Sequence, residues 1–423
     1  MRRSLERLFA ERVLVVILLI GLAARLLFVA SLENRLYWPI DEKAYDQLAV
    51  SLVEGRGYVD ESGRPTAYRP VGYPVFLALL YAVFGRSLIM VRIVQSLLTA
   101  ALIYVIYLLT LRLFDRRSAR IAAAICALYP YYIYVSGVLY SEALCVPLFA
   151  CAMYLFMAAC DRPTMARFAM LGGILGALVL IRPNLLATLP FFVAWYVAVP
   201  GVRQRVPLWM VTILVVAAAC TVTPWAARNY TRLGAITLTT NGGRNFWLGN
   251  NPSATADTGN EVAIPAELAT KLAKVTSEVE RDRIYYASAL AFIRQHPERF
   301  LRLTVSKALA FWRLYPMPSS GFKQNETLSK VASIVTFGPV LALAIFGLWL
   351  SWPQAPRQNL AFLCLFVSFD LAHALYIAIV RLRLPVDAFL MPFASFAVGW
   401  LSTRRWTSAR KYPVRWGKCV EEV

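Results

Sequence analysis

The chain has 423 residues, of which 59% are hydrophobic and only 16% are charged, whereas ordinary soluble domains are roughly 45–50% apolar and about 25% charged. This composition excludes a disordered protein, a collagen-like fibre and a small disulfide-stabilised secreted domain, and it argues against a soluble enzyme. The formal net charge of +20 indicates membrane topology before a nucleic-acid ligand, because basic residues accumulate in the cytoplasmic loops of membrane proteins. The sequence therefore predicts an integral membrane protein.

Long apolar runs follow one another along the chain, and a spanning helix needs about 20 mostly apolar residues. Tyr73–Phe84 is too short for a span and is expected to be interfacial or re-entrant. Phe300–Tyr315 carries three basic residues, which would be costly in lipid. The remaining runs are the predicted spans: Val13–Ala30, Ser87–Leu111, Ile121–Gly137, Leu139–Cys160, Phe168–Ile181, Leu185–Val199, Leu208–Val222, Leu328–Leu350, Leu360–Ile379 and Val386–Leu401.

The distribution of basic residues orients these spans. With both doubtful segments excluded, 19 of the 44 basic residues fall in short loops and tails on one face, which the positive-inside rule makes cytoplasmic. Counting only one of the two segments as a span would place the basic tail outside. We therefore predict about ten spans in an all-α helical bundle, with both termini in the cytoplasm.

The spans divide the chain into four parts. The transmembrane module 1–222 includes a first outer loop, 31–72, and is followed by an outer-face region, 223–322, further spans, 323–402, and a basic cytoplasmic tail, 403–423.

Within the outer-face region, the helical spacing of Leu268, Leu272, Val275 and Val279 predicts an amphipathic helix lying on the membrane-embedded body. Turn clusters at 241–243 and 249–252 surround Phe246-Trp247.

The first outer loop is dense in acidic, aromatic, Gly and Pro residues, which is typical of a loop packed on a membrane body. Motifs recur in order along the chain: Asp41-Glu42 with Tyr45, Gly55-x-Gly57, Arg69-Pro70-x-Gly72-Tyr73-Pro74, Tyr140-Ser141-Glu142, Arg182-Pro183, Asn245-Phe246-Trp247-x-Gly249-Asn250-Asn251-Pro252 and Arg381-x-Arg383-x-Pro385. This ordered set resembles the bacterial GT-C membrane glycosyltransferases related to protein O-mannosyltransferases and to lipid A aminoarabinose transferase.

The resemblance implies a GT-C-type bundle with interfacial helices, in a bacterial inner membrane, whose active site faces outside. It implies transfer of a sugar, with inversion, from a polyprenyl-phosphate donor to an acceptor hydroxyl or phosphate. Polyprenyl phosphate is a good leaving group, so a base and phosphate-binding cations are needed rather than the paired carboxylates of a glycosidase.

The resemblance also assigns roles to acidic residues. Asp41 matches the family's first-loop aspartate and is the candidate base. Glu42 is the alternative acid, since neighbours in an extended loop point to opposite sides. Glu142 matches a second acidic position, where it would orient the acceptor or a metal. The alternative is that Glu142 is an interfacial carboxylate at a helix N-terminus.

Arginines are the candidates for donor phosphate, because a guanidinium suits phosphate oxygens. Arg381 and Arg383, in a short outer turn, are the leading pair, with snorkelling at the end of a span as the alternative. Arg69, Arg182 and Arg244 are further candidates for the same phosphate.

Polar residues inside or near spans have both structural and functional interpretations. Arg25 lies near the outer end of the first span and is expected to snorkel, and Lys307 is expected to touch lipid phosphate only. Asp370 and His373 share one helix face and either satisfy each other or couple a proton to transport.

The sequence identifies no certain cofactor, and a divalent metal ion is possible. Only two histidines are present, which excludes a His-rich metal site, while a carboxylate-bound divalent ion stays open because some relatives use one. The expected partners are the lipid-linked sugar donor, a lipid or glycan acceptor and membrane lipids. Nucleic acid is not expected, since the basic residues are dispersed among short loops.

A transporter or flippase of lipid-linked saccharides is the alternative function. It would explain the span count and the Asp370–His373 pair, although inverted repeats are not evident and the motif-dense first loop would have no role.

Overall fold

The structure is a computed structural model, and it describes residues 2–37, 40–256, 262–315 and 326–403. Helices are the regular elements of these residues, which contain no named strand; an isolated bridge pairs Val59 with Pro65. The chain is therefore an all-helical, multi-pass membrane protein, as the sequence predicts. The part of the predicted tail from 404 onward lies outside the described residues.

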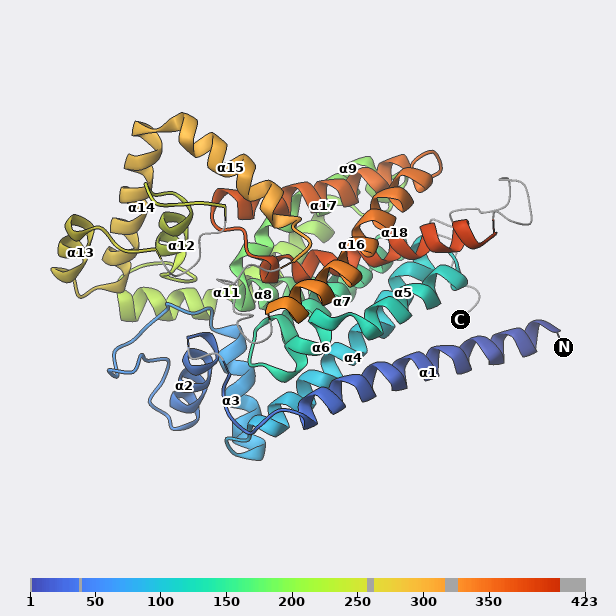
Figure 1. Ribbon diagram of the computed structural model, residues 1–423, viewed down its shortest axis with the longest axis horizontal. Coiled ribbons are helices and arrows are strands. Elements are labelled where there is room, and N and C mark those ends of the chain that lie inside the picture. The colour runs from blue at the N-terminus through green and yellow to red at the C-terminus, as the bar shows by residue number, and fades with distance from the viewer. Residues whose placement is uncertain (1, 38–39, 257–261, 316–325, 404–423) are drawn as a thin grey trace.

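The long bundle runs along the horizontal axis of Figure 1. Its helices are α1 (Arg2–Ala30), α4 (Leu88–Leu113), α5 (Arg116–Leu128), α6 (Pro130–Gly137), α7 (Glu142–Asp161), α8 (Met165–Ile181), η1 (Pro183–Thr188), α9 (Leu189–Ala198), α10 (Val202–Arg205), α11 (Leu208–Leu233), α16 (Glu326–Ser351), α17 (Pro356–Leu375), η3 (Val380–Arg383) and α18 (Leu384–Thr403).

Seven helices in the described residues are long and apolar enough to cross a membrane. The predicted spans Phe168–Ile181 and Leu185–Val199 fall on shorter apolar helices. The predicted span Ile121–Gly137 is wrong as one helix: it is split between α5 and α6, because Tyr129 is extended before Pro130.

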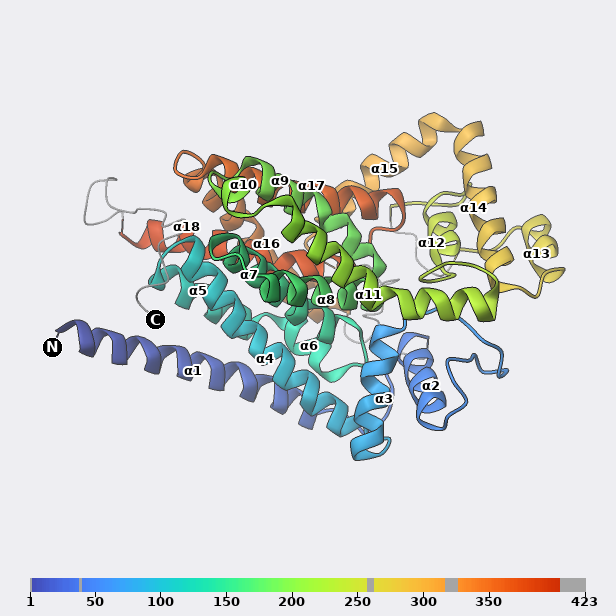
Figure 2. The same cartoon turned by 180° about the vertical axis from the view of Figure 1, so that it is seen from behind.

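The remaining helices gather at one end of the bundle, on the left in Figure 1, and the view from behind agrees (Figure 2). They are α2 (Asp41–Val53), α3 (Gly72–Phe84), α12 (Gly242–Gly249), α13 (Ala266–Ala273), α14 (Glu278–Gln295) and α15 (Pro297–Phe311). The start of α1 and the end of α18 both lie at the opposite end of the bundle.

Close backbone contact joins α8 to α11. A Cβ atom added to Gly172 would lie 2.2 Å from the carbonyl oxygen of Leu214, and one added to Gly176 would lie 2.8 Å from that of Ala218. Glycine at both positions lets the two backbones approach, as small residues do in membrane helix pairs. This contact fixes the end of α8, where Arg182 follows.

Two predictions about basic residues are wrong. Arg25 does not snorkel: it is fully buried, and its guanidinium donates to Thr99 Oγ1 and to the carbonyls of Gly21 and Ala127. Lys307 is buried rather than placed on lipid. Long side chains enter the interior here because backbone carbonyls are available to accept their hydrogen bonds.

The outer-face region differs from its prediction in two places. The expected amphipathic helix is two helices, α13 and α14, and Leu268 and Leu272 of α13 pack on Trp247 and Tyr285 rather than on the bundle. The residues around Phe246 form α12 rather than turns alone. In both cases the apolar residues pack into a small hydrophobic core within the outer-face region.

Candidate active site

Five charged residues form a continuous chain of ion pairs, which we call the charge chain: Arg69, Asp41, Arg381, Glu142 and Arg182. Arg69 Nη2 lies 2.7 Å from Asp41 Oδ1, and Arg381 Nη1 lies 2.7 Å from Asp41 Oδ2. On its other side, Arg381 Nε lies 3.1 Å from Glu142 Oε1, and Arg182 Nη1 lies 2.9 Å from the same oxygen. Cations and carboxylates thus alternate.

Each member comes from a different local structure. Asp41 and Glu142 are the first residues of α2 and α7, where a carboxylate complements the positive end of the helix dipole. Arg182 follows α8, before Pro183, and is extended. Arg381 lies on the short 3-10 helix η3. The predicted extended backbone at Asp41 is therefore wrong, since α2 begins there.

Four of the five members of the charge chain, all except Glu142, line a cavity of about 870 Å³. Arg69, Asp41, Arg182, Arg244 and Arg381 all contribute to its wall. With Glu142, which is ion-paired to two of them, six of the eight candidate residues come together. Of the two carboxylates, the side chain of Asp41 is 17% exposed whereas that of Glu142 is 2% exposed. Asp41 is therefore the acid that a ligand in the cavity can reach, and Glu142 lies behind it.

Two candidates lie elsewhere. Glu42 is fully buried, and it accepts hydrogen bonds from the backbone N–H groups of Leu139 (2.6 Å) and Tyr37 (2.5 Å). Arg383 is also fully buried, with its Nε 2.8 Å from Asp387 Oδ1. Neither residue lines the cavity, so these positions support anchoring roles rather than the predicted contacts with acceptor and donor.

The charge chain sets the ionisation of Asp41. Burial by itself would raise the pKa of this carboxyl, but the guanidinium groups of Arg381 and Arg69 outweigh burial and hold the pKa below its usual range. Asp41 is therefore a carboxylate at neutral pH, and its basicity is low while both arginines contact it.

Aromatic side chains support the arginines. The Arg381 guanidinium lies 4.4 Å from the ring centroid of Tyr140, and that of Arg69 lies 5.6 Å from the ring of Tyr45. Such contacts orient a guanidinium without removing its charge. Tyr45 was missed by the sequence analysis as a site residue, although it follows Asp41 by one helical turn.

The two titratable residues near the end of α17, Asp370 and His373, do not contact each other. His373 lines the cavity, with Nε2 2.9 Å from Asn184 Nδ2 and Nδ1 2.7 Å from the Phe369 carbonyl. Asp370 instead accepts a 3.0 Å hydrogen bond from Trp312 Nε1 and faces a separate apolar cavity. The predicted mutual satisfaction of the pair is therefore wrong, whereas proton coupling to transport stays a prediction.

The residues of this site are poorly suited to binding a metal ion. The described residues contain no group of three or more His, Cys, Asp or Glu side chains placed to hold a metal ion. The two carboxylates of the charge chain already share the guanidinium of Arg381 between them. A positive charge therefore already occupies the place where a divalent ion would bridge them.

Comparison with known proteins agrees with this architecture. A family described as dolichyl-phosphate-mannose-protein mannosyltransferase matches residues 68–226. No curated protein matches the chain.

Among solved structures, the oligosaccharyltransferase AglB from Archaeoglobus fulgidus, in complex with an inhibitory peptide and a dolichol-phosphate, has a TM-score of 0.57 at 15% identity, over 96% of this chain and 52% of AglB. An Archaeoglobus fulgidus oligosaccharyltransferase tethered with an acceptor peptide has a TM-score of 0.58 at 17% identity, over 94% of this chain and 50% of that enzyme. ArnT from Cupriavidus metallidurans bound to undecaprenyl phosphate has a TM-score of 0.45 at 14% identity, over 90% and 77%.

The chain therefore has the helical GT-C membrane fold. It resembles the glycosyltransferases of the protein O-mannosyltransferase group in sequence over 68–226 and AglB in fold over nearly its whole length. It spans about half the length of AglB.

Proposed function

We propose that the chain is a membrane glycosyltransferase that moves a sugar from a polyprenyl-phosphate donor to an acceptor on the outer face. The observation that carries this proposal is the charge chain on the cavity wall. Three arginines face two carboxylates there, which leaves an excess of positive charge for a phosphate. Buried Arg69 Nε also has no hydrogen-bond partner, so it can donate to a ligand.

Asp41 is the proposed base. It would take the proton from the acceptor hydroxyl while the acceptor oxygen attacks the anomeric carbon. The bond from that carbon to the phosphate oxygen breaks, and its electron pair leaves with the polyprenyl phosphate. A single displacement of this kind inverts the anomeric centre, and the arginines stabilise the departing phosphate.

The arginines would change partners when the donor binds. In the empty site Arg381 and Arg69 contact Asp41, which lowers its basicity. A donor phosphate that attracts these guanidinium groups weakens their hold on Asp41, so its pKa rises towards the ordinary value. Donor binding would thus activate the base before the acceptor reacts.

The proposed orientation places the cavity outside a bacterial cytoplasmic membrane and both termini inside. The fold supports this orientation because the start of α1 and the end of α18 lie at the end of the bundle opposite α2 and α12 (Figure 1). The flippase alternative loses one of its supports, since Asp370 and His373 line different cavities.

The test uses purified protein in sealed lipid vesicles, a radiolabelled polyprenyl-phosphate sugar and a crude envelope acceptor fraction. Asp41→Asn should reduce transfer by a factor of about 10²–10⁴ while donor binding persists, because the phosphate-binding arginines stay. Glu54→Gln, an exposed acid at the end of α2, is the matched control. Equal transfer by wild type and Asp41→Asn would remove Asp41 from the reaction, and donor movement without transfer would favour the flippase.

A further inference from the structure

A second cavity, of about 620 Å³, adjoins the first. Its wall includes the first outer loop between Asp60 and Tyr68, the end of α11 and the first turns of α14. Tyr68 and Arg244 line both cavities. A molecule bound in the second cavity can therefore present one of its groups to the charge chain.

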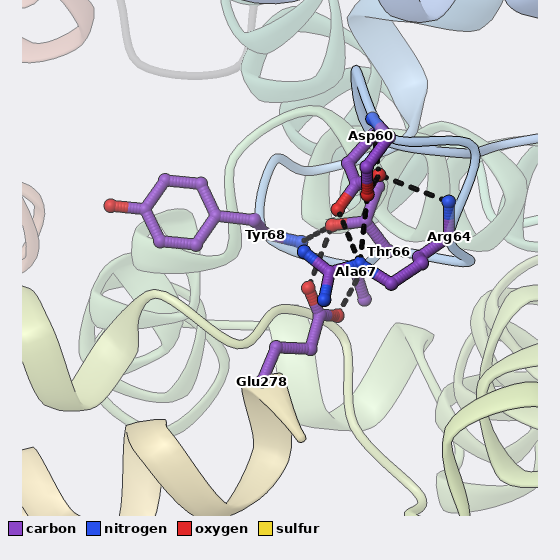
Figure 3. Close-up of polar contacts among 7 residues, drawn as sticks. Asp60, Arg64, Thr66, Ala67, Tyr68 and Glu278 are labelled. Atoms are coloured by element: carbon purple, nitrogen blue, oxygen red, sulfur yellow. Dashed lines mark hydrogen bonds and ion pairs between the residues drawn. The ribbon is translucent and has the colours of Figure 1, made fainter. Parts of the chain in front are cut away.

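The wall of this second cavity is held by a cross-link between distant segments. Glu278, at the start of α14, accepts a 2.8 Å hydrogen bond from Thr66 Oγ1 and a 2.5 Å hydrogen bond from the backbone N–H of Ala67 (Figure 3). The Tyr68 ring points away from this cluster (Figure 3). The loop and the outer-face region thus form one preassembled wall.

A buried hydroxyl in the wall lacks a partner. Thr240 is 4% exposed, and its backbone N–H is satisfied by the Ala67 carbonyl at 3.0 Å. Its Oγ1 has no hydrogen-bond partner, although buried hydroxyl groups are nearly always hydrogen-bonded. Because Thr240 lines the cavity, a polar ligand there would satisfy this group.

The charges around the cavity favour an anion. The three acids of its wall already accept hydrogen bonds from other groups of the chain. Glu278 accepts those described above, Asp282 accepts one from the Gly243 N–H at 2.6 Å, and Asp60 accepts two from the N–H groups of Ser62 and Arg64. Arg232 and Arg281 line the cavity, and neither forms an ion pair with any described residue. The wall carries four arginines, Arg64, Arg232, Arg244 and Arg281, against these three acids. This excess of positive charge beside an unsatisfied hydroxyl matches an anionic group that also carries hydroxyls.

We infer that the second cavity is the acceptor site and that it binds an anionic saccharide, with Arg281 and Arg232 on the anionic group and Thr240 on a sugar oxygen. The assignment of this cavity to the acceptor rests on the proposed function, whereas the binding of an anionic saccharide there does not depend on it. The acceptor hydroxyl would pass Tyr68 and Arg244 to reach Asp41, which removes its proton.

Direct binding to the nanodisc-embedded protein tests the site. The probes are glucose 1-phosphate, glucuronic acid, neutral glucose and inorganic phosphate. We expect both anionic sugars to bind at least tenfold more tightly than glucose, and phosphate alone to bind more weakly than either anionic sugar. Arg281→Ala and Thr240→Val should each weaken the anionic sugars, by at least tenfold for Arg281→Ala. Arg283→Ala, an exposed neighbour that lines neither cavity, should change nothing.

Charge-independent sugar binding, or the same effect from Arg283→Ala and Arg281→Ala, would overturn the inference. Inorganic phosphate binding as tightly as the anionic sugars would overturn the saccharide assignment. In the transfer assay, Arg281→Ala should raise the KM for acceptor and leave the KM for donor unchanged; a raised donor KM instead would assign the cavity to the donor. If Asp41→Asn transfers normally, the proposed function fails, yet the binding results still decide what this cavity holds.

Discussion

Arg381 Nη1 lies 2.7 Å from Asp41 Oδ2 across 340 positions of the sequence, and Arg381 Nε also contacts Glu142. One guanidinium therefore joins the first outer loop, the start of α7 and the turn before α18. The reaction proposed for this site depends on whether that contact gives way to a phosphate.

Substitution of Arg381 should weaken donor binding. Arg381→Lys keeps the positive charge but cannot contact two carboxylates through separate nitrogen atoms in the same plane. We expect the KM for donor to rise at least tenfold, with a smaller change for Arg381→Lys than for Arg381→Ala. Arg56→Lys, an exposed arginine of the first loop, is the control. Unchanged donor affinity in Arg381→Ala would remove this residue from the phosphate site.

The pH dependence of transfer should report the charge chain. Because the neighbouring arginines lower the pKa of Asp41, the acid limb of kcat/KM, which reports free enzyme, should lie below the ordinary value of about 3.9. Arg69→Gln removes one of these cations, so the pKa of Asp41 rises and activity is lost at a higher pH than in wild type. An acid limb in Arg69→Gln identical to that of wild type would contradict the role of Asp41 as base.

Lys307 should make stability depend on pH. Its Nζ donates to the carbonyls of Gly249 (3.1 Å) and Tyr376 (3.0 Å), and burial lowers its pKa to about 8. Between about pH 8 and 10.5 the unfolded state therefore binds more protons than the folded state. The free energy of unfolding should rise with pH across this window, by at most about 1.4 kcal/mol per pH unit.

Lys307→Met should abolish this slope and cost about 1–3 kcal/mol at neutral pH, because it leaves the two carbonyls without their donor. Thermal unfolding in nanodiscs over the same pH range measures both effects. Lys271→Met, on the exposed face of α13, should retain the wild-type slope. A slope that persists in Lys307→Met would assign the pH dependence to another group.

Adjacent glycines of α8 provide a matched test of helix packing. Gly172→Ala places a methyl group 2.2 Å from the Leu214 carbonyl oxygen, whereas at Gly173 the nearest atom is 3.9 Å away. We expect Gly172→Ala to lower the free energy of unfolding by about 1–3 kcal/mol. Gly173→Ala should be neutral or stabilise the helix by about 0.5–1 kcal/mol. Similar melting temperatures for both variants would show that α8 and α11 can move apart freely.

The fold was predictable where composition decides it. The apolar runs located the main helices, because a helix that contacts lipid or the protein core must be apolar along most of its length. The break at Pro130 is a local backbone effect that a hydropathy window averages away. The position of Arg25 depended on carbonyls of a helix about a hundred residues later, which no local pattern reveals.

The residue types that form the site could be predicted from the sequence, but their arrangement in space could not. Asp41, Arg69 and Arg381 were recognised from ordered motifs and do come together. Arg383 was grouped with Arg381 by spacing, but residues two apart on a 3-10 helix point in different directions. Glu42 follows Asp41 on a helix rather than in an extended loop, and it turns towards backbone N–H groups inside the protein.

Arg25 bears on how the protein is made. The groups that accept its hydrogen bonds beyond its own turn lie 74 and 102 positions later, so they do not exist when the first helix leaves the ribosome. A guanidinium without these partners is costly to place in a membrane helix. We therefore expect α1 to complete its insertion only when α4 and α5 emerge, which makes the order of synthesis part of assembly.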